Sequence, residues 1–157
     1  MEGKSLAFAP DLVVCAGYMR IFSGDFVRHY AGRMLNIHPS LLPAYKGLDT
    51  HRRALEDGAA VHGCSVHYVT EELDGGPVVG QASVPVLPGD TTESLAERVH
   101  HAEHRLYPEV IGWYAAGRLR MDGEVVLLDG APMSQPVHRS YADAERSEEH
   151  TSELQSR

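Results

Sequence analysis

The sequence predicts an α/β fold in which a mostly parallel β-sheet is flanked by helices. Two observations support this prediction. Residues 11–17 form a short, continuous apolar run, which is typical of a strand buried on both faces of a parallel sheet. Strand-like segments then alternate with segments of helical periodicity, and this order is expected of α/β proteins.

Capping and breaking residues delimit the next elements. Ser23 is a suitable N-cap for a short helix that ends before Gly32. Residues 34–38 predict a second strand, which ends at Pro39 because proline has no N–H to donate. A polar segment then leads into a short helix over residues 51–57.

The following segment predicts two strands and a long helix. The strand-like runs 64–69 and 78–86 are separated by residues 70–77, which form a loop rather than a tight hairpin turn. Asp90 and Glu93 have the spacing of a capped helix start. The apolar residues at helical spacing are Leu95, Val99, Ala102, Leu106, Val110 and Trp113.

A kink and a hairpin are expected towards the end of the domain. Pro108 predicts a kink within the long helix. Asp122 and Gly123 are suited to a tight turn, and they predict a hairpin between residues 119–121 and 124–128.

A change in composition after residue 130 suggests a domain boundary. Residues 1–130 are interpreted as one domain, whereas 131–157 lose periodicity and become rich in polar residues, which predicts disorder. Residues 146–156 resemble the in-frame translation of a common DNA-sequencing adapter, which predicts a segment foreign to the fold.

The composition narrows the classes of function. The chain has 157 residues, 22 acidic and 14 basic side chains and a net charge of -8, which argues against a nucleic-acid-binding surface and favours small-molecule partners. No apolar stretch is long enough to span a membrane, and residues 1–10 lack a signal-peptide pattern, so a cytoplasmic location is expected. Cys15 and Cys64 lie in apolar strand-like runs and are expected to be reduced core residues.

Asn36 and His38 are candidate functional residues. Side chains alternate along a strand, so both lie on one face at the strand's carboxyl end, where ligands bind in open α/β sheets. An amide and an imidazole can together stabilise a developing oxyanion. The spacing alone fits a capped strand end with a hydrogen-bonded histidine equally well.

The loop 70–77 contains a second candidate, Asp74. The two glycines after it allow the backbone to approach a ligand, and a carboxylate beside a histidine favours the imidazolium form. Taken alone, Asp-Gly-Gly is also ordinary turn chemistry.

Two motifs carry a resemblance to a known family. One is the segment NIHPSLLPAYKG, which begins at Asn36, and the other is the segment HGCSVHYVTEELDGGPVVGQ, which begins at His62. In these segments the chain resembles the folate-dependent formyltransferase superfamily, in particular the branch that acts on glycinamide ribonucleotide. The resemblance runs from about Pro10 to Gly130. It implies a Rossmann-like fold and a catalytic trio at Asn36, His38 and Asp74.

The resemblance also implies a reaction. A formyl group would pass from 10-formyltetrahydrofolate, the co-substrate, to the amine of glycinamide ribonucleotide in purine synthesis, by direct attack and without a metal. Asn36 and protonated His38 would stabilise the tetrahedral oxyanion, and Asp74 would hold the imidazolium and position a water that helps move the proton.

Binding residues follow from the same resemblance. The implied folate-binding residues are Met19, Arg20, Ile21, Phe22, Asn36, Thr70, Glu71, Glu72, Leu73 and Asp74. Glu103, with His100 one turn away, would bind the ribonucleotide. A metal site at His100, His101 and His104 is disfavoured because the family uses none, and His67 is interpreted as a structural histidine. Asp49 departs from the histidine that close relatives often carry.

The family pattern also begins earlier than this chain. Members start with a βα unit whose glycine-rich loop holds the substrate phosphate, and no such loop precedes the strand at 11–17. We therefore expect about two missing βα units. The consequences would be weak ribonucleotide binding and possible self-association through an exposed sheet edge.

Three alternative functions share parts of this pattern. Methionyl-tRNA formyltransferases usually have an additional carboxyl-terminal nucleic-acid-binding domain, which a nonperiodic acidic tail does not provide. Formyltetrahydrofolate hydrolase is the closer enzyme alternative, although it usually has an amino-terminal regulatory domain. The third alternative is an inactive folate-binding fragment of the transferase.

Overall fold

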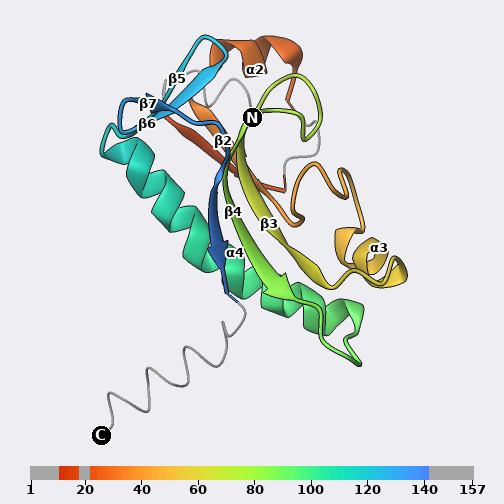
Figure 1. Ribbon diagram of the computed structural model, residues 1–157. Helices are drawn as coiled ribbons and strands as arrows, with labels where there is room; N and C mark the ends of the chain where they lie inside the picture. The colour runs from red at the N-terminus through yellow and green to blue at the C-terminus, as the bar shows by residue number, and fades with distance from the viewer. Residues whose placement is uncertain (1–10, 18–21, 142–157) are drawn as a thin grey trace, which may run out of the picture.

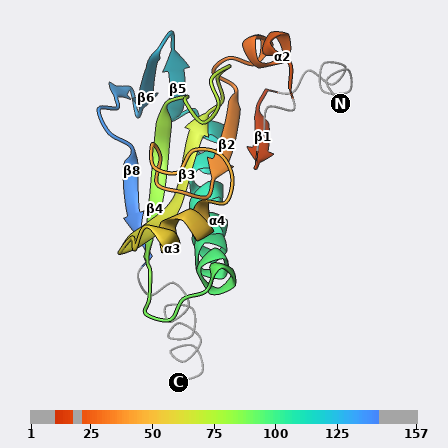
Figure 2. The same cartoon turned by 90° about the vertical axis from the view of Figure 1, so that its right-hand side faces the viewer.

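The computed structural model describes residues 11–17 and 22–141, and its centre is a five-stranded sheet of order β1-β2-β3-β4-β8 (Figures 1 and 2). The strands of this sheet are β1 (Val13–Ala16), β2 (Met34–His38), β3 (Val61–Tyr68), β4 (Val78–Pro85) and β8 (Val137–Ser140). The β1–β2 and β4–β8 pairs are parallel, and β3 is antiparallel to both neighbours. Four of the five strands therefore run in the same direction, which confirms the predicted α/β fold.

Helices flank the sheet. They are α2 (Gly24–His29), α3 (Thr50–Glu56) and α4 (Thr92–Ala115). Ser23 caps α2 as predicted, since its side chain accepts a hydrogen bond from the Phe26 amide at 3.1 Å. Helix α4 lies along one face of the sheet (Figure 2), and its six predicted apolar positions are all buried in the core.

The start of α4 differs from the prediction. Thr91, not Asp90, is the N-cap, and Thr91 and Ser94 exchange side chain-to-backbone hydrogen bonds of 3.1 and 2.9 Å. Asp90 instead accepts hydrogen bonds from Arg98 and from the Leu87 amide, and the Arg98 guanidinium lowers the pKa of Asp90 to about 2. The helix therefore begins one residue later than the spacing of Asp90 and Glu93 predicts, because the Asp90 carboxylate binds the Arg98 guanidinium instead of capping the helix.

A small second sheet follows α4. It consists of β5 (Leu119–Asp122), β6 (Val125–Leu128) and β7 (Ala131–Pro132), in that order. The predicted β5–β6 hairpin is confirmed, and Gly123 at its turn has the positive φ of 64° that glycine tolerates best.

The predicted disorder from Ala131 onward is wrong for residues 131–141. The strands β7 and β8 lie in this segment, and His138 on β8 lies 3.1 Å from the Ser83 hydroxyl on β4. Arg139 donates to Glu109 on α4. An edge strand can be held by one ladder of backbone bonds and a few polar contacts, so apolar periodicity did not reveal it. The segment 146–156 lies outside the described residues.

The two faces of the central strands differ in chemistry. Cys64, Val66 and Tyr68 of β3 belong to the core cluster packed against α4. Ser65 and His67 alternate with them and lie on the opposite face with Asn36, to which His67 is hydrogen-bonded. That face is therefore polar and buried. Cys15 and Cys64 are free thiols, as predicted.

Among the described residues, none of the helices combines the length and the apolar character needed to cross a membrane.

Candidate active site

The three residues of the proposed catalytic trio come together at the end of β2. Asn36, His38 and Asp74 have exposed fractions of only 0%, 3% and 4%. Strand pairing places His67 opposite Asn36 and Ser65 opposite His38. The loop between β3 and β4 then brings Asp74 over both histidines. The structure thus forms a buried polar cluster of an amide, two imidazoles and a carboxylate.

His67 fixes the orientation of the Asn36 amide. The Nδ1 of His67 lies 2.9 Å from the Tyr68 carbonyl oxygen, which can only accept, so Nδ1 carries the proton. Burial lowers the pKa of His67, which favours the neutral ring with an unprotonated Nε2. The Asn36 Nδ2 therefore donates to His67 Nε2, over 3.1 Å. The interpretation of His67 as a structural histidine fits this contact, but the residue that it holds is a candidate catalytic one.

His38 lies between two acceptors. Its Nε2 is 2.8 Å from the Tyr45 carbonyl oxygen, and its Nδ1 is 3.5 Å from Asp74 Oδ1. With one acceptor facing each nitrogen, the site can accommodate an imidazole protonated on both nitrogens.

Asp74 is held by the backbone of another loop. Its Oδ2 accepts a hydrogen bond from the Gly47 amide at 2.9 Å, while its Oδ1 is buried with no hydrogen-bond partner among the described residues. The backbone of Asp74 is left-handed, with φ of 52°. Gly76 has to be glycine, because a Cβ there would lie 1.8 Å from the Tyr68 carbonyl oxygen. The two glycines therefore let this loop pack closely against the end of β3, and Asp74 Oδ1 has no hydrogen-bond partner among the described residues.

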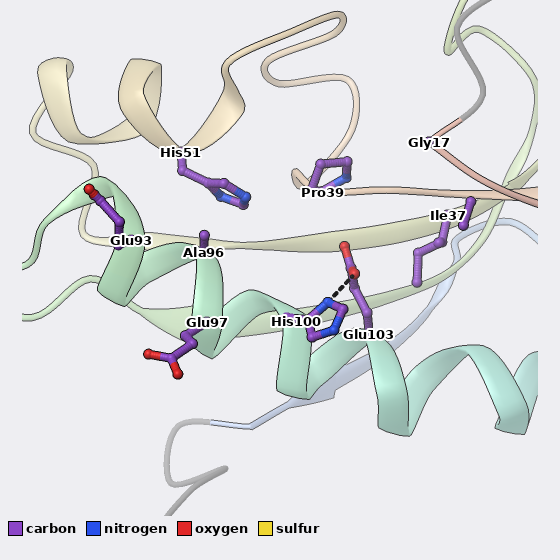
Figure 3. Close-up of a pocket in the computed structure, with 10 residues that line it drawn as sticks. Gly17, Ile37, Pro39, His51, Glu93, Ala96, Glu97, His100 and Glu103 are labelled. Atoms are coloured by element: carbon purple, nitrogen blue, oxygen red, sulfur yellow. Dashed lines mark ion pairs between the residues drawn. The ribbon is translucent and has the colours of Figure 1, made fainter.

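A cavity of about 600 Å³ opens between the ends of β1 and β2 and the helix α4 (Figure 3), and it is lined by Ile37 and Pro39, the neighbours of His38 in the chain. Glu103 and His100 lie on its α4 wall and form an ion pair of 3.4 Å between Nδ1 and Oε1. Burial raises the pKa of Glu103, although the His100 ring partly opposes this. The structure thus brings together the two residues expected to bind the ribonucleotide.

His51 lies on the opposite wall of the same cavity (Figure 3). Its Nδ1 is 3.1 Å from Nε2 of His62, which is 1% exposed. Burial, with the nearby His51 and His38, lowers the pKa of His62 to about 4. His62 is therefore neutral at physiological pH. The departure at residue 49 is also explained locally, since Asp49 precedes α3 and pairs with Arg52 at 3.2 Å.

The expected folate-binding residues are only partly placed. Phe22 stacks on Phe26 with ring centroids 4.6 Å apart, next to the start of α2. Thr70, Glu71, Glu72 and Leu73 form the first part of the loop 70–77, directly before Asp74. Met19, Arg20 and Ile21 lie outside the described residues.

The described part of the chain contains no group of three or more His, Cys, Asp or Glu side chains arranged to hold a metal ion. His100 and His104 instead pack their rings against each other, with centroids 4.2 Å apart.

Sequence reasoning missed Tyr45 and Gly47, whose backbone groups contact His38 and Asp74. No side-chain pattern could reveal them, because a carbonyl oxygen and an amide occur at nearly every residue. His67 could have been paired with Asn36 if the antiparallel register of β2 and β3 had been inferred.

The chain is similar in sequence to proteins of one known family. A family model described as formyl transferase matches residues 1–111. The phosphoribosylglycinamide formyltransferase of Escherichia coli is 61% identical over 123 residues, covering 78% of this chain and 58% of that protein. The chain thus spans a little over half the length of that relative.

Solved structures agree with the sequence comparison. The phosphoribosylglycinamide formyltransferase of Coxiella burnetii aligns with a TM-score of 0.81 and 50% identity, covering 88% of this chain and 67% of the other. A formyltetrahydrofolate deformylase from Pseudomonas syringae aligns with a TM-score of 0.75 and 29% identity, covering 80% of this chain and 42% of the other.

Proposed function

The chain belongs to the formyl transferase family, and on this premise we propose that it carries the catalytic centre of an enzyme that transfers a formyl group from 10-formyltetrahydrofolate to the amine of glycinamide ribonucleotide, a step of purine synthesis. One observation supports this proposal above all others. Asn36, His38 and Asp74 meet in one buried cluster that combines hydrogen-bond donors with a carboxylate, and such groups can stabilise the oxyanion of acyl transfer.

The proposed reaction is a direct attack. The amine nitrogen of the ribonucleotide forms a bond to the formyl carbon, and the carbonyl electrons move onto oxygen. That oxyanion would accept hydrogen bonds from the Asn36 amide and from an N–H of the protonated His38 ring. The bond from carbon to the folate nitrogen then breaks, and tetrahydrofolate leaves with a proton that the attacking amine gives up.

Asp74 supports the charged form of His38 in this proposal. Its Oδ1 lies 3.5 Å from His38 Nδ1 and has no hydrogen-bond partner among the described residues, so it can accept from an imidazolium. The same carboxylate would position a water that carries the proton from the attacking nitrogen to the leaving folate nitrogen.

The substrates would approach from different sides. Glu103 and His100 line the cavity of about 600 Å³ that would receive the ribonucleotide. Residues 70–74 would form one wall of the folate pocket.

The relative identities favour the transferase over the hydrolase. The chain is 61% identical to the E. coli relative and 29% identical to the P. syringae deformylase. In a hydrolase the same trio would direct a water molecule, instead of an amine, to the formyl carbon.

The test follows tetrahydrofolate release from 10-formyltetrahydrofolate in the presence and absence of glycinamide ribonucleotide. It uses two proteins. One is this chain, and the other is a fusion protein in which the amino-terminal segment of the E. coli relative precedes this chain. We expect turnover by the fusion protein that requires the ribonucleotide. Equal release without ribonucleotide would favour the hydrolase, and no turnover by a folded fusion protein would contradict the proposed transfer.

A further inference from the structure

We propose that Arg28 and Glu71 form a clamp that holds the loop 70–77 against α2 and thereby keeps Asp74 in position over His38. The two residues are 43 positions apart in the sequence, and their ion pair joins the helix α2 to the loop. In this role Arg28 and Glu71 are positioning residues.

The contacts of Arg28 are directional. One guanidinium nitrogen, Nη1, donates to Glu71 Oε1, and the other, Nη2, donates to Asp25 Oδ1. Asp25 precedes Arg28 by three residues on α2, so it holds the guanidinium on the helix surface. Because the guanidinium is planar and its Nη2 is bound to Asp25, its Nη1 can donate in only a few directions, and in the structure it donates to Glu71 on the loop.

Gly24 provides the space for this contact. A Cβ at residue 24 would lie 2.7 Å from Glu71 Oε1 and 3.1 Å from Arg28 Nη1. The first residue of α2 therefore leaves room for both charged groups because it has no side chain. A side chain at residue 24 would therefore collide with the oxygen that forms the ion pair.

The segment between Glu71 and Asp74 is short, so fixing the position of Glu71 also restricts the position of Asp74. Only two residues separate Glu71 from Asp74, and the Gly75 amide closes a turn onto the Glu72 carbonyl oxygen at 3.1 Å. Asp74 Oδ2 then accepts from the Gly47 amide. If the loop leaves α2, the Gly75 and Gly47 hydrogen bonds are therefore the next contacts to open.

The functional consequence of the clamp rests on the function proposed above. Residues 70–74 would form a wall of the folate pocket, so a loosened loop would weaken folate binding and displace Asp74 from His38. The side chains of Arg28 and Glu71 are 58% and 54% exposed, which makes the clamp sensitive to salt.

Amide hydrogen exchange of the purified chain tests the clamp without any substrate. In Arg28→Gln and in Glu71→Gln we expect the Gly47 and Gly75 amides to exchange about 1.5- to 5-fold faster at low salt, the range expected for one exposed ion pair. The double variant should exchange no faster than either single variant, because both changes remove the same contact. At about 1 M salt the exchange rates of these two amides in the wild-type chain should become similar to those in the variants, because salt screens the ion pair.

Arg118→Gln is the matched control, because Arg118 forms a similarly exposed ion pair with Asp129 in the second sheet, with side chains 49% and 55% exposed. It should leave both amides unchanged. Unchanged exchange of Gly47 and Gly75 in Arg28→Gln, or an equal change in Arg118→Gln, would overturn the clamp.

A second measurement separates the clamp from the proposed function. Titration with 5-formyltetrahydrofolate should show a weaker Kd in Arg28→Gln by a factor similar to that in the exchange experiment. If the wild-type chain and the fusion protein both fail to bind this folate, the proposed function is wrong, and the exchange data still decide whether the clamp exists.

Discussion

His38 and Asp74 face each other at 3.5 Å, from Nδ1 to Oδ1, with their side chains only 4% and 1% exposed. The two residues are 36 positions apart, and each is held from its other side by the backbone of residues 45–47. Because both side chains are buried, the carboxylate acts on the imidazole with little screening by bulk solvent. The proposed chemistry depends on this arrangement.

Replacing Asp74 with Asn tests the role of its charge. The amide retains an oxygen for the Gly47 N–H but no longer stabilises an imidazolium at His38. We expect kcat for formyl transfer by the fusion protein to fall about 100-fold or more. Folate affinity should change much less. Glu124→Gln, an exposed change far from the loop in the turn of the second sheet, is the control and should retain kcat. Comparable kcat values for the two variants would show that the Asp74 charge has no part in the reaction.

Glu103→Gln tests ribonucleotide binding. A hydrogen bond to a charged group contributes about 1.5–3 kcal/mol, so KM for glycinamide ribonucleotide should rise about 10-fold or more while KM for the folate stays constant. Glu97→Gln, an exposed change on the wall of the same cavity, should have a small effect.

The raised pKa of Glu103 adds a pH dependence to this test. As the pH falls, Glu103 loses its charge at a higher pH than an ordinary glutamate does. The KM for the ribonucleotide should therefore rise as the pH is lowered towards that pKa. The rise should be absent in Glu103→Gln, and its persistence there would assign it to another group.

His62 should make the free energy of unfolding depend on pH. Its pKa is about 4 in the folded chain, against 6.5 for an unperturbed histidine, so the unfolded state binds more protons between these values. The contribution of His62 to the free energy of unfolding should be fully present above pH 6.5, and up to about 3 kcal/mol of it should be lost as the pH is lowered to 4. Urea unfolding of wild type and His62→Gln measures this. Parallel pH profiles for the two proteins would show that His62 is not the cause.

The outer edge of β1 should promote self-association. Within the described residues β1 pairs only with β2, and Val14 on it is 46% exposed. Unpaired edge strands readily pair with another chain. Sedimentation of the purified chain should show association that increases with concentration and is reduced by Val14→Lys. The similarly exposed Val125 lies on β6 of the second sheet, and Val125→Lys should not reduce it. A monomer at all concentrations would contradict the prediction.

The sequence predicted those features that depend on local chemistry. Ser23 and the six apolar positions of α4 could be identified because capping and helical periodicity are local properties. Asn36 and His38 could be placed on one face because side chains alternate along a strand. Asp74 was joined to them by resemblance to a family, since its position depends on the path of a loop.

The remaining features depend on tertiary contacts. The strand β8 was missed because polar contacts and one ladder of backbone bonds hold it, without an apolar pattern. Asp90 was mistaken for a helix cap because Arg98, which binds it, is eight residues away. The backbone groups of Tyr45 and Gly47 that contact His38 and Asp74 leave no signature in residue types.

The rate of formyl transfer by Asn36→Ala and His38→Ala variants of the fusion protein tests the central claim most directly. Loss of one donor to a developing oxyanion typically costs about 100- to 1000-fold in kcat. We predict a fall of this size in kcat in each variant, with the fold intact by circular dichroism. A folded variant of either kind that turns over the ribonucleotide at nearly the wild-type rate would contradict the assignment of Asn36, His38 and Asp74 as the catalytic centre.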